Sequence, residues 1–176
     1  RTIKGIKRMT KTVGIAGLGA IGKADYTALE QGINGFKLKA VSEISPPDDL
    51  QVPNLSFEEL CHECDLIIEC LPPVHVTELC KHAFACGKDI IVISSCALLM
   101  FPGILEQHKA SKSRIFVPSG AIIGMDGVTA LAHLGIKSAH IATNKKPSGY
   151  EGAPYITEQN IDLSTITKRT RIFEGN

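Results

Sequence analysis

Apolar and polar positions alternate along the chain in a way that predicts strands and helices in regular order. Five short apolar runs are typical of buried strands, at residues 12–17, 36–43, 65–70, 89–94 and 114–118. Helical signals lie between and beside them, at residues 23–33, 57–61, 74–87 and 101–112. Because parallel neighbours need a helical crossover, this order predicts an α/β fold, a doubly wound parallel sheet.

Two local signals fix individual helices. Ser56 and Glu59 have the spacing of a capping box, which predicts the start of a short helix. The helix over 74–87 carries a stripe at i, i+3, i+4, i+7 and i+8 and is stopped by Gly87. The stripe consists of Val76, Leu79, Cys80, Ala83 and Phe84.

The pattern changes after residue 118. Residues 11–118 form the predicted sheet domain, and residues 119–176 begin a smaller unit with a helix-like stretch at 122–135 and a strand-like stretch at 138–143. We expect this second unit to be incomplete at Asn176. Residues 1–10 are rich in basic side chains and are interpreted as a leader or tag-like segment.

Composition excludes several classes of protein. Apolar residues make up 44% and charged residues 21%, and the formal net charge is +1. The chain has no surplus of basic residues, so nucleic-acid binding is not expected. The longest apolar run, over 89–105, is broken by serines and a proline before it reaches the roughly 20 residues of a membrane span, so no membrane partner is expected either.

A glycine motif follows the first predicted strand and opens the first helix. In G-x-G-x-x-G, the first glycine permits a tight turn, the second lets a pyrophosphate approach the backbone, and the third lets helix and strand pack closely. The phosphates then meet free N–H groups at the start of the helix. This predicts a Rossmann-type dinucleotide site, formed by Gly17, Leu18, Gly19, Ala20, Ile21 and Gly22.

Glu43 indicates which dinucleotide is bound. It ends the second strand, 21 residues beyond Gly22, where a carboxylate can accept from both ribose hydroxyls. A carboxylate repels a 2′-phosphate, so NAD is the preferred cofactor, with NADP possible. The loops after the third and fourth strands, 70–73 and 94–98, should flank the nicotinamide. Their candidate cofactor-binding residues are Leu71, Pro72 and Ser95.

The six cysteines suggest neither disulfides nor a complete metal site. Cys61 and Cys64 have the spacing of half a zinc site, but the sequence offers no clear second pair, so no metal is predicted. Buried, reduced thiols and a cytoplasmic location are expected instead. His75, Glu78 and His82 can share a helix face, which we interpret as a solvated face.

Longer motifs resemble the L-aspartate dehydrogenase family. They are VPSGAIIGMDG at 117–127 and TNKKPSGYEGAPY at 143–155, with further similarity at 17–22, 65–73, 87–99 and 172–176. The resemblance, from Thr12 to the last residue, implies a Rossmann domain, a smaller α+β substrate domain and a homodimer. It also implies NAD(P)-dependent oxidative deamination of L-aspartate. Iminoaspartate, the product, would hydrolyse to oxaloacetate and ammonia or enter NAD biosynthesis. Ala121 would contact the cofactor.

The sequence departs from the family pattern at two positions, and it offers no match to the family's catalytic histidine. Cys96 stands where the family often has glycine, and Asn144 where it often has arginine. None of the six histidines matches the family's catalytic position, which follows the FEG stretch by tens of residues. We therefore assign no catalytic residue, and expect a truncated chain that carries cofactor binding without the full catalytic site.

Two alternatives stay open. A homoserine dehydrogenase-like oxidoreductase has a similar fold, although that family has a lysine where Cys96 stands. A non-catalytic dinucleotide-binding module would account for a chain without the catalytic segment.

Overall fold

The computed structural model describes residues 9–120 and 122–175. They divide into two compact units, with the division between Ile123 and Gly124. This is five residues beyond the boundary expected after residue 118. Each unit is described by itself.

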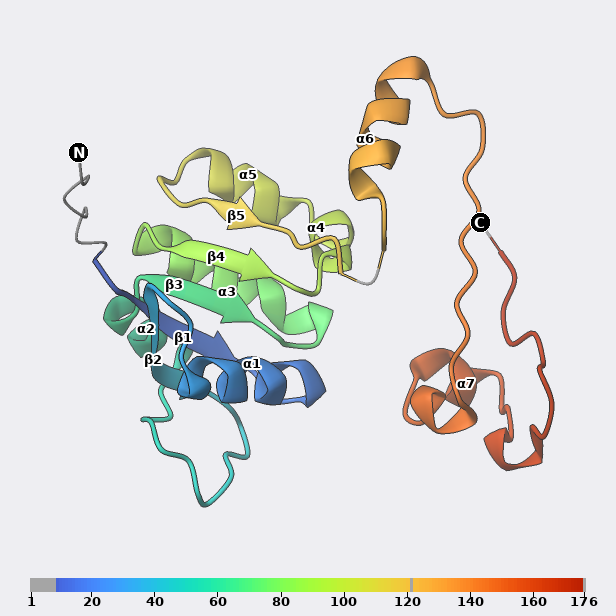
Figure 1. Cartoon of the computed structure of the whole chain (residues 1–176), viewed down its shortest axis with the longest axis horizontal. Coiled ribbons are helices and arrows are strands. Elements are labelled where there is room, and N and C mark those ends of the chain that lie inside the picture. The colour runs from blue at the N-terminus through green and yellow to red at the C-terminus, as the bar shows by residue number, and fades with distance from the viewer. Residues whose placement is uncertain (1–8, 121, 176) are drawn as a thin grey trace, which may run out of the picture. The chain divides into compact units, whose positions relative to one another are not determined.

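The first unit is a parallel five-stranded sheet in the order β2-β1-β3-β4-β5 (Figure 1). The strands are β1 (Lys11–Ala16), β2 (Phe36–Ser42), β3 (Leu66–Glu69), β4 (Asp89–Val92) and β5 (Ile115–Phe116). The helices are α1 (Ala20–Gln31), α2 (Phe57–Glu63), α3 (Pro73–Ala85), α4 (Cys96–Met100) and α5 (Gly103–Lys109). The predicted α/β class is confirmed.

Helices cover both faces of this sheet because its strands alternate apolar side chains between them. Ile15 packs in one core cluster with Leu29 of α1. The next residue, Ala16, belongs to a second cluster with Leu60 of α2 and Leu79 of α3. Each strand therefore contributes to two apolar layers, which is why its sequence reads as a nearly continuous apolar run.

Local sequence signals account for several helix features, although the observed helix bounds differ from the predicted ranges by up to three residues. The Ser56 Oγ accepts from the Glu59 N–H at 3.3 Å, and the Glu59 carboxylate accepts from the Ser56 N–H at 2.9 Å, so the capping box is confirmed. All five residues of the predicted apolar stripe on α3 are buried. Helix α1 ends at Gln31, and Gly32 follows with φ of 100°.

The fourth strand is followed by a short helix where a loop was expected. Helix α4 begins at Cys96 inside the predicted 94–98 loop, and buries Ala97 in the core. The fifth strand is shorter than its apolar run because only Ile115 and Phe116 pair with β4.

The second unit contains α6 (Met125–Leu134), α7 (Pro154–Glu158) and two short 3₁₀ turns, η1 (Pro147–Tyr150) and η2 (Leu163–Thr165). The predicted helix lies within 122–135, but the predicted strand at 138–143 is wrong: these residues form no strand. A strand needs a hydrogen-bonded neighbour, and the described part of this unit contains no other strand to supply one.

One outer edge of the sheet is partly covered by its own chain. The Val41 N–H donates to the Pro53 carbonyl at 3.0 Å, and the Leu55 N–H donates to the Val41 carbonyl at 2.8 Å. The segment 53–55 therefore runs along β2 as a single parallel bridge. Across residues 9–120 and 122–175, no helix is both long and apolar enough to cross a membrane.

Candidate functional site

Two glycines of the motif are required by the fold itself. Gly17 has φ of +91°, and a Cβ there would lie 2.5 Å from the Cys70 carbonyl oxygen. A Cβ on Gly22 would lie 1.9 Å from the Gly17 carbonyl oxygen. The turn therefore folds back on itself and against the end of β3, and neither position has room for a side chain.

Gly19 differs from the other two. Its backbone is extended, with φ of −66° and ψ of −163°, and no atom lies within 4 Å of where a Cβ would be. It precedes α1, whose first turn has no side-chain cap and no acidic residue. Neither strain nor packing in the described residues explains this glycine. A group that approaches the free N–H donors of α1 from outside would explain it.

A cleft of about 250 Å³ opens beside Gly19. It lies at the carboxyl ends of β1, β3 and β4. The strand order reverses here, because β2 lies on one side of β1 and β3 lies on the other. Its lining residues are Gly19, Ala20, Ile21, Cys70, Leu71, Ile93 and Ser94. The fold thus brings the predicted residues 19–21 and Leu71, which are distant in sequence, into one cleft.

Glu43 is bound to the glycine turn. Its Oε2 accepts from the Leu18 N–H at 2.6 Å, and its Oε1 accepts from the N–H groups of Ile44 at 2.8 Å and Ser45 at 3.3 Å. These bonds, chiefly that from Leu18, lower the pKa of Glu43 below its usual value. Asn54 fixes the Glu43 backbone through bonds of 2.8 and 2.9 Å. A carboxylate is therefore held in place at the turn.

Two further predicted site residues, Pro72 and Ser95, do not line this cleft. Pro72 caps the start of α3, and Ser95 is exposed beside Ser94, which does line the cleft. Ala121 lies outside the described residues. Cys96, the position at which the sequence departs from the family pattern, is exposed at the start of α4.

Sequence reasoning did not predict Cys70, Ile93 and Ser94 as site residues, although they line the cleft, nor the acidic residue that contacts its loops, Glu69. It is the last residue of β3, its side chain is fully buried, and its carboxylate accepts from the backbone N–H groups of Leu71 and Ser94. The signal was a charged residue at the end of an otherwise apolar strand. Most such residues are solvated, and only the tertiary structure shows that this one is not.

The cysteine pair Cys61 and Cys64 lies in the apolar core. Burial raises the thiol pKa to about 12 for Cys61 and about 11 for Cys64, so both are neutral at physiological pH. Cys80 is also buried, whereas Cys96 is exposed, contrary to the expectation of buried thiols. Within residues 9–120 and 122–175, no cluster of three or more His, Cys, Asp or Glu side chains is placed to hold a metal ion.

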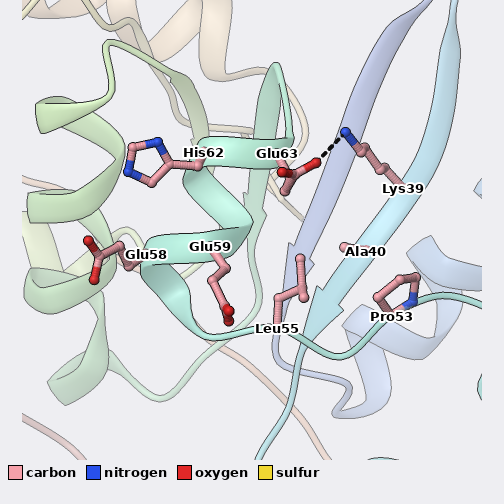
Figure 2. Close-up of a pocket in the computed structure, with 8 residues that line it drawn as sticks. All are labelled: Lys39, Ala40, Pro53, Leu55, Glu58, Glu59, His62 and Glu63. Atoms are coloured by element: carbon pink, nitrogen blue, oxygen red, sulfur yellow. Dashed lines mark ion pairs between the residues drawn. The ribbon is translucent and has the colours of Figure 1, made fainter.

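A second pocket, of about 400 Å³, lies between α2 and β2 (Figure 2). Three of its charged side chains are engaged with protein groups. Lys39 pairs with Glu63 at 2.7 Å, and Glu59 is held in the capping box. Lys39 and Ala40 lie before the carboxyl end of β2. This pocket is therefore separate from the glycine turn, and the smaller cleft is the better candidate site.

No protein-family model matches this chain, but curated relatives match most of it. L-aspartate dehydrogenase 3 of Bordetella bronchiseptica is 35% identical over 93% of this chain and 64% of its own length. L-aspartate dehydrogenase of Bradyrhizobium diazoefficiens is 34% identical over 93% of this chain and 61% of its own. The chain thus spans less than two thirds of the length of these relatives.

Solved structures share the fold at lower identity. Biliverdin reductase from Synechocystis, in complex with biliverdin and NADP+, is 17% identical with a TM-score of 0.57, covering 72% of this chain and 43% of its own. The WlbA dehydrogenase of Chromobacterium violaceum, in complex with NADH and UDP-GlcNAcA, is 16% identical with a TM-score of 0.55, covering 66% of this chain and 37% of its own. These neighbours confirm a Rossmann-type fold. The curated relatives confirm the resemblance to the L-aspartate dehydrogenase family over 93% of the chain.

Proposed function

We propose that this protein is an NAD-dependent oxidoreductase that deaminates L-aspartate. The observation that carries the cofactor assignment is the open position beside Gly19, at the mouth of the cleft and at the start of α1. The substrate assignment is supported by relatives named L-aspartate dehydrogenase over 93% of the chain.

The glycine turn would hold the pyrophosphate. The first-turn N–H groups of α1 have no side-chain cap, and the helix dipole favours an anion there. The missing side chain at Gly19 leaves space for the phosphates to approach the backbone. The residues present therefore fit a dinucleotide.

Glu43 would select between the two dinucleotides. Its lowered pKa keeps it ionised at neutral pH, and its bond to the Leu18 N–H holds it at the glycine turn. An ionised carboxylate accepts from ribose hydroxyls and repels a 2′-phosphate. This arrangement favours NAD over NADP.

Leu71 and Ser94 would flank the nicotinamide side of the cleft. When bound, NAD+ would supply the hydride acceptor for oxidation of L-aspartate at Cα; loss of a proton from the amine would then give the imine, which water would hydrolyse to oxaloacetate and ammonia. The chain's own contribution is to bind and orient, through the backbone of the glycine turn and the Glu43 carboxylate. Ala121, by the family resemblance, would add a cofactor contact. No described side chain is assigned as the acid or base.

The family resemblance extends the proposal to a homodimer and to supply of iminoaspartate for NAD biosynthesis. A cytoplasmic location agrees with the cysteines, all of which are free thiols, since reducing compartments keep thiols unpaired.

Titration with NADH and NADPH tests the cofactor assignment. The chain has no tryptophan, so the cofactor's own fluorescence gives a signal without tryptophan background. We expect NADH to bind at least about tenfold more tightly than NADPH, which is about 1.4 kcal/mol. Glu43→Gln should narrow that ratio, because it removes the charge and keeps the side-chain length. Equal affinities of the unsubstituted protein for both cofactors would contradict the role of Glu43.

An activity assay tests the substrate. With no acid or base assigned, we expect slow NADH formation at most, and any NADH should form when L-aspartate is added with NAD+, and not when L-homoserine is added. Turnover of L-homoserine in preference to L-aspartate would replace this function with the homoserine dehydrogenase alternative.

A further inference from the structure

Glu69 is a buried carboxylate that the proposed function does not yet use. It ends β3 inside the sheet, between Ala16 of β1 and Val92 of β4. Its side chain is 0% exposed. Among residues 9–120 and 122–175, no Lys, Arg or His forms an ion pair with it. A buried charge without a cation is costly unless hydrogen bonds stabilise it, so its contacts require an explanation.

Its two oxygens join two separate loops. Oε1 accepts from the Leu71 N–H at 2.6 Å, in the loop after β3. Oε2 accepts from the Ser94 N–H at 2.9 Å, in the loop after β4. The Ser94 hydroxyl then donates to the Leu71 carbonyl at 2.6 Å. Three hydrogen bonds therefore fix the backbone of Leu71 relative to that of Ser94.

The geometry requires a carboxylate and not an amide. Both partners of Glu69 are N–H donors, and an ionised carboxylate is the side chain that offers two acceptors and no donor. A glutamine would turn its NH₂ group towards one of the two N–H groups, so one bond would be lost and two donors would face each other. Glutamine can therefore fill the space without holding both loops.

The loops that Glu69 joins are those that border the cleft. Leu71 and Ser94 line it together with Gly19, and Cys70 contacts the turn closely enough to exclude a side chain on Gly17. We propose that Glu69 is a positioning residue that holds Leu71 and Ser94 in place for the nicotinamide half of the cofactor. This inference rests on the proposed function, because it needs a dinucleotide in the cleft.

Calorimetric titration of Glu69→Gln with NADH and with ADP tests the inference. ADP can occupy the glycine turn and Glu43 but has no nicotinamide to reach Leu71 and Ser94. We expect the affinity for NADH to fall about tenfold or more, as for loss of a hydrogen bond to a charged group, and the affinity for ADP to stay within about twofold. Unchanged NADH affinity, or an equal fall for both ligands, would overturn the proposal.

Glu59→Gln is the matched control. It also removes a carboxylate that accepts from a backbone N–H, that of Ser56, but it lies on α2 away from the cleft. The thermal unfolding temperature should fall in this variant, while the ratio of NADH affinity to ADP affinity should stay at the value of the unsubstituted protein. A changed ratio in Glu59→Gln would show that the ratio follows general stability and would overturn the role of Glu69.

A second variant keeps the test decisive if Glu69→Gln does not fold. Ser94→Ala removes only the hydroxyl bond to the Leu71 carbonyl and leaves the carboxylate satisfied. We expect NADH to bind about threefold more weakly and the affinity for ADP to stay unchanged, and unchanged NADH binding would refute the proposal.

An unsubstituted protein that binds neither ligand would refute the proposed function together with this role. An unsubstituted protein that binds both, with both variants unaffected, would refute the role alone.

Discussion

Carboxylates have different partners at the two ends of the parallel strands, which are called the amino edge and the carboxyl edge below. At the amino edge, Asp89 pairs with Arg114 at 2.6 Å and with Lys11 at 3.6 Å, and Asp65 accepts from the Thr12 N–H and hydroxyl at 2.8 Å each. These contacts tie strand β1 to β3 and β4 to β5. Most of their partners are side chains, and neither the cleft beside Gly19 nor the pocket between α2 and β2 is lined by Asp65 or Asp89.

At the carboxyl edge the carboxylates bind backbone N–H groups of loops. Glu43 holds the Leu18 N–H in the glycine turn, and Glu69 holds Leu71 and Ser94. These loops border the cleft of about 250 Å³. Acidic residues at one edge therefore join strands, while those at the other edge hold the loops of the proposed cofactor site. Substitutions should therefore separate stability from cofactor affinity.

The largest effect is expected for Gly22→Ala. A Cβ there would lie 1.9 Å from the Gly17 carbonyl oxygen, a backbone atom, so α1 must move. We expect the free energy of unfolding in urea to fall by at least about 3 kcal/mol, and NADH binding to be lost with it. Gly103→Ala is the control, because Gly103 starts α5 with nothing within 4 Å of its Cβ position. A Gly22→Ala protein as stable as this control would contradict the close packing.

Gly19→Ala should instead leave the stability nearly unchanged and weaken cofactor binding. Its Cβ meets no protein atom, so the free energy of unfolding should change by less than about 0.5 kcal/mol. Affinity for NADH should nevertheless fall about tenfold, because the methyl group occupies space needed by the phosphates. Urea unfolding and NADH titration of the same sample measure both quantities. Unaltered NADH affinity would remove the main support for the pyrophosphate position.

Asp89→Asn tests the amino edge. Loss of the pairs with Arg114 and Lys11 should lower the free energy of unfolding by about 1–2 kcal/mol and leave NADH affinity unchanged. Glu106→Gln provides the control, since its pair with Lys109 is exposed on both sides and should contribute less than about 0.5 kcal/mol. Weaker NADH binding in Asp89→Asn would contradict the inference that carboxylates at the amino edge act on stability alone.

The smallest effect concerns acid stability. Hydrogen bonds lower the pKa of Asp65, of Asp89 and of Glu43, chiefly from Thr12, Arg114 and Leu18 respectively. A lowered folded-state pKa stabilises the fold above the unfolded-state pKa, and this stabilisation is lost as pH falls through the folded-state value. The unfolding temperature should therefore stay constant from neutral pH to about pH 5 and decline below about pH 4. The double variant Asp65→Asn, Asp89→Asn should decline less steeply, and an identical acid decline would argue against these contacts.

Local patterns were sufficient to predict most of the first unit. Helix α3 was predicted because its apolar spacing matches the helical period, and the start of α2 because Ser56 and Glu59 are neighbours across one turn. The convergence of Gly19 and Leu71 followed from topology, since carboxyl ends of parallel strands share an edge.

Features that depend on distant partners were not predictable in this way. Glu69 contacts Ser94, 25 residues away, and no local pattern specifies that pair. The stretch 138–143 has strand propensity, but without a neighbouring strand in its unit propensity alone does not form one. Local preference is therefore informative only where the fold supplies the matching surface.

The bridge between Val41 and Asn54 also bears on how the protein resists self-association. Strand β2 is an outer strand, and an unpaired outer strand can template the addition of another chain. The segment 53–55 occupies its hydrogen-bonding groups at Val41, and the exposed side chain of Lys37 lies on the part that precedes it, whereas Lys39 pairs with Glu63. A second copy that approached this edge would meet a strand already bound at Val41 and a like charge at Lys37 before it. The connection between β2 and α2 thus acts as protection against edge-to-edge aggregation.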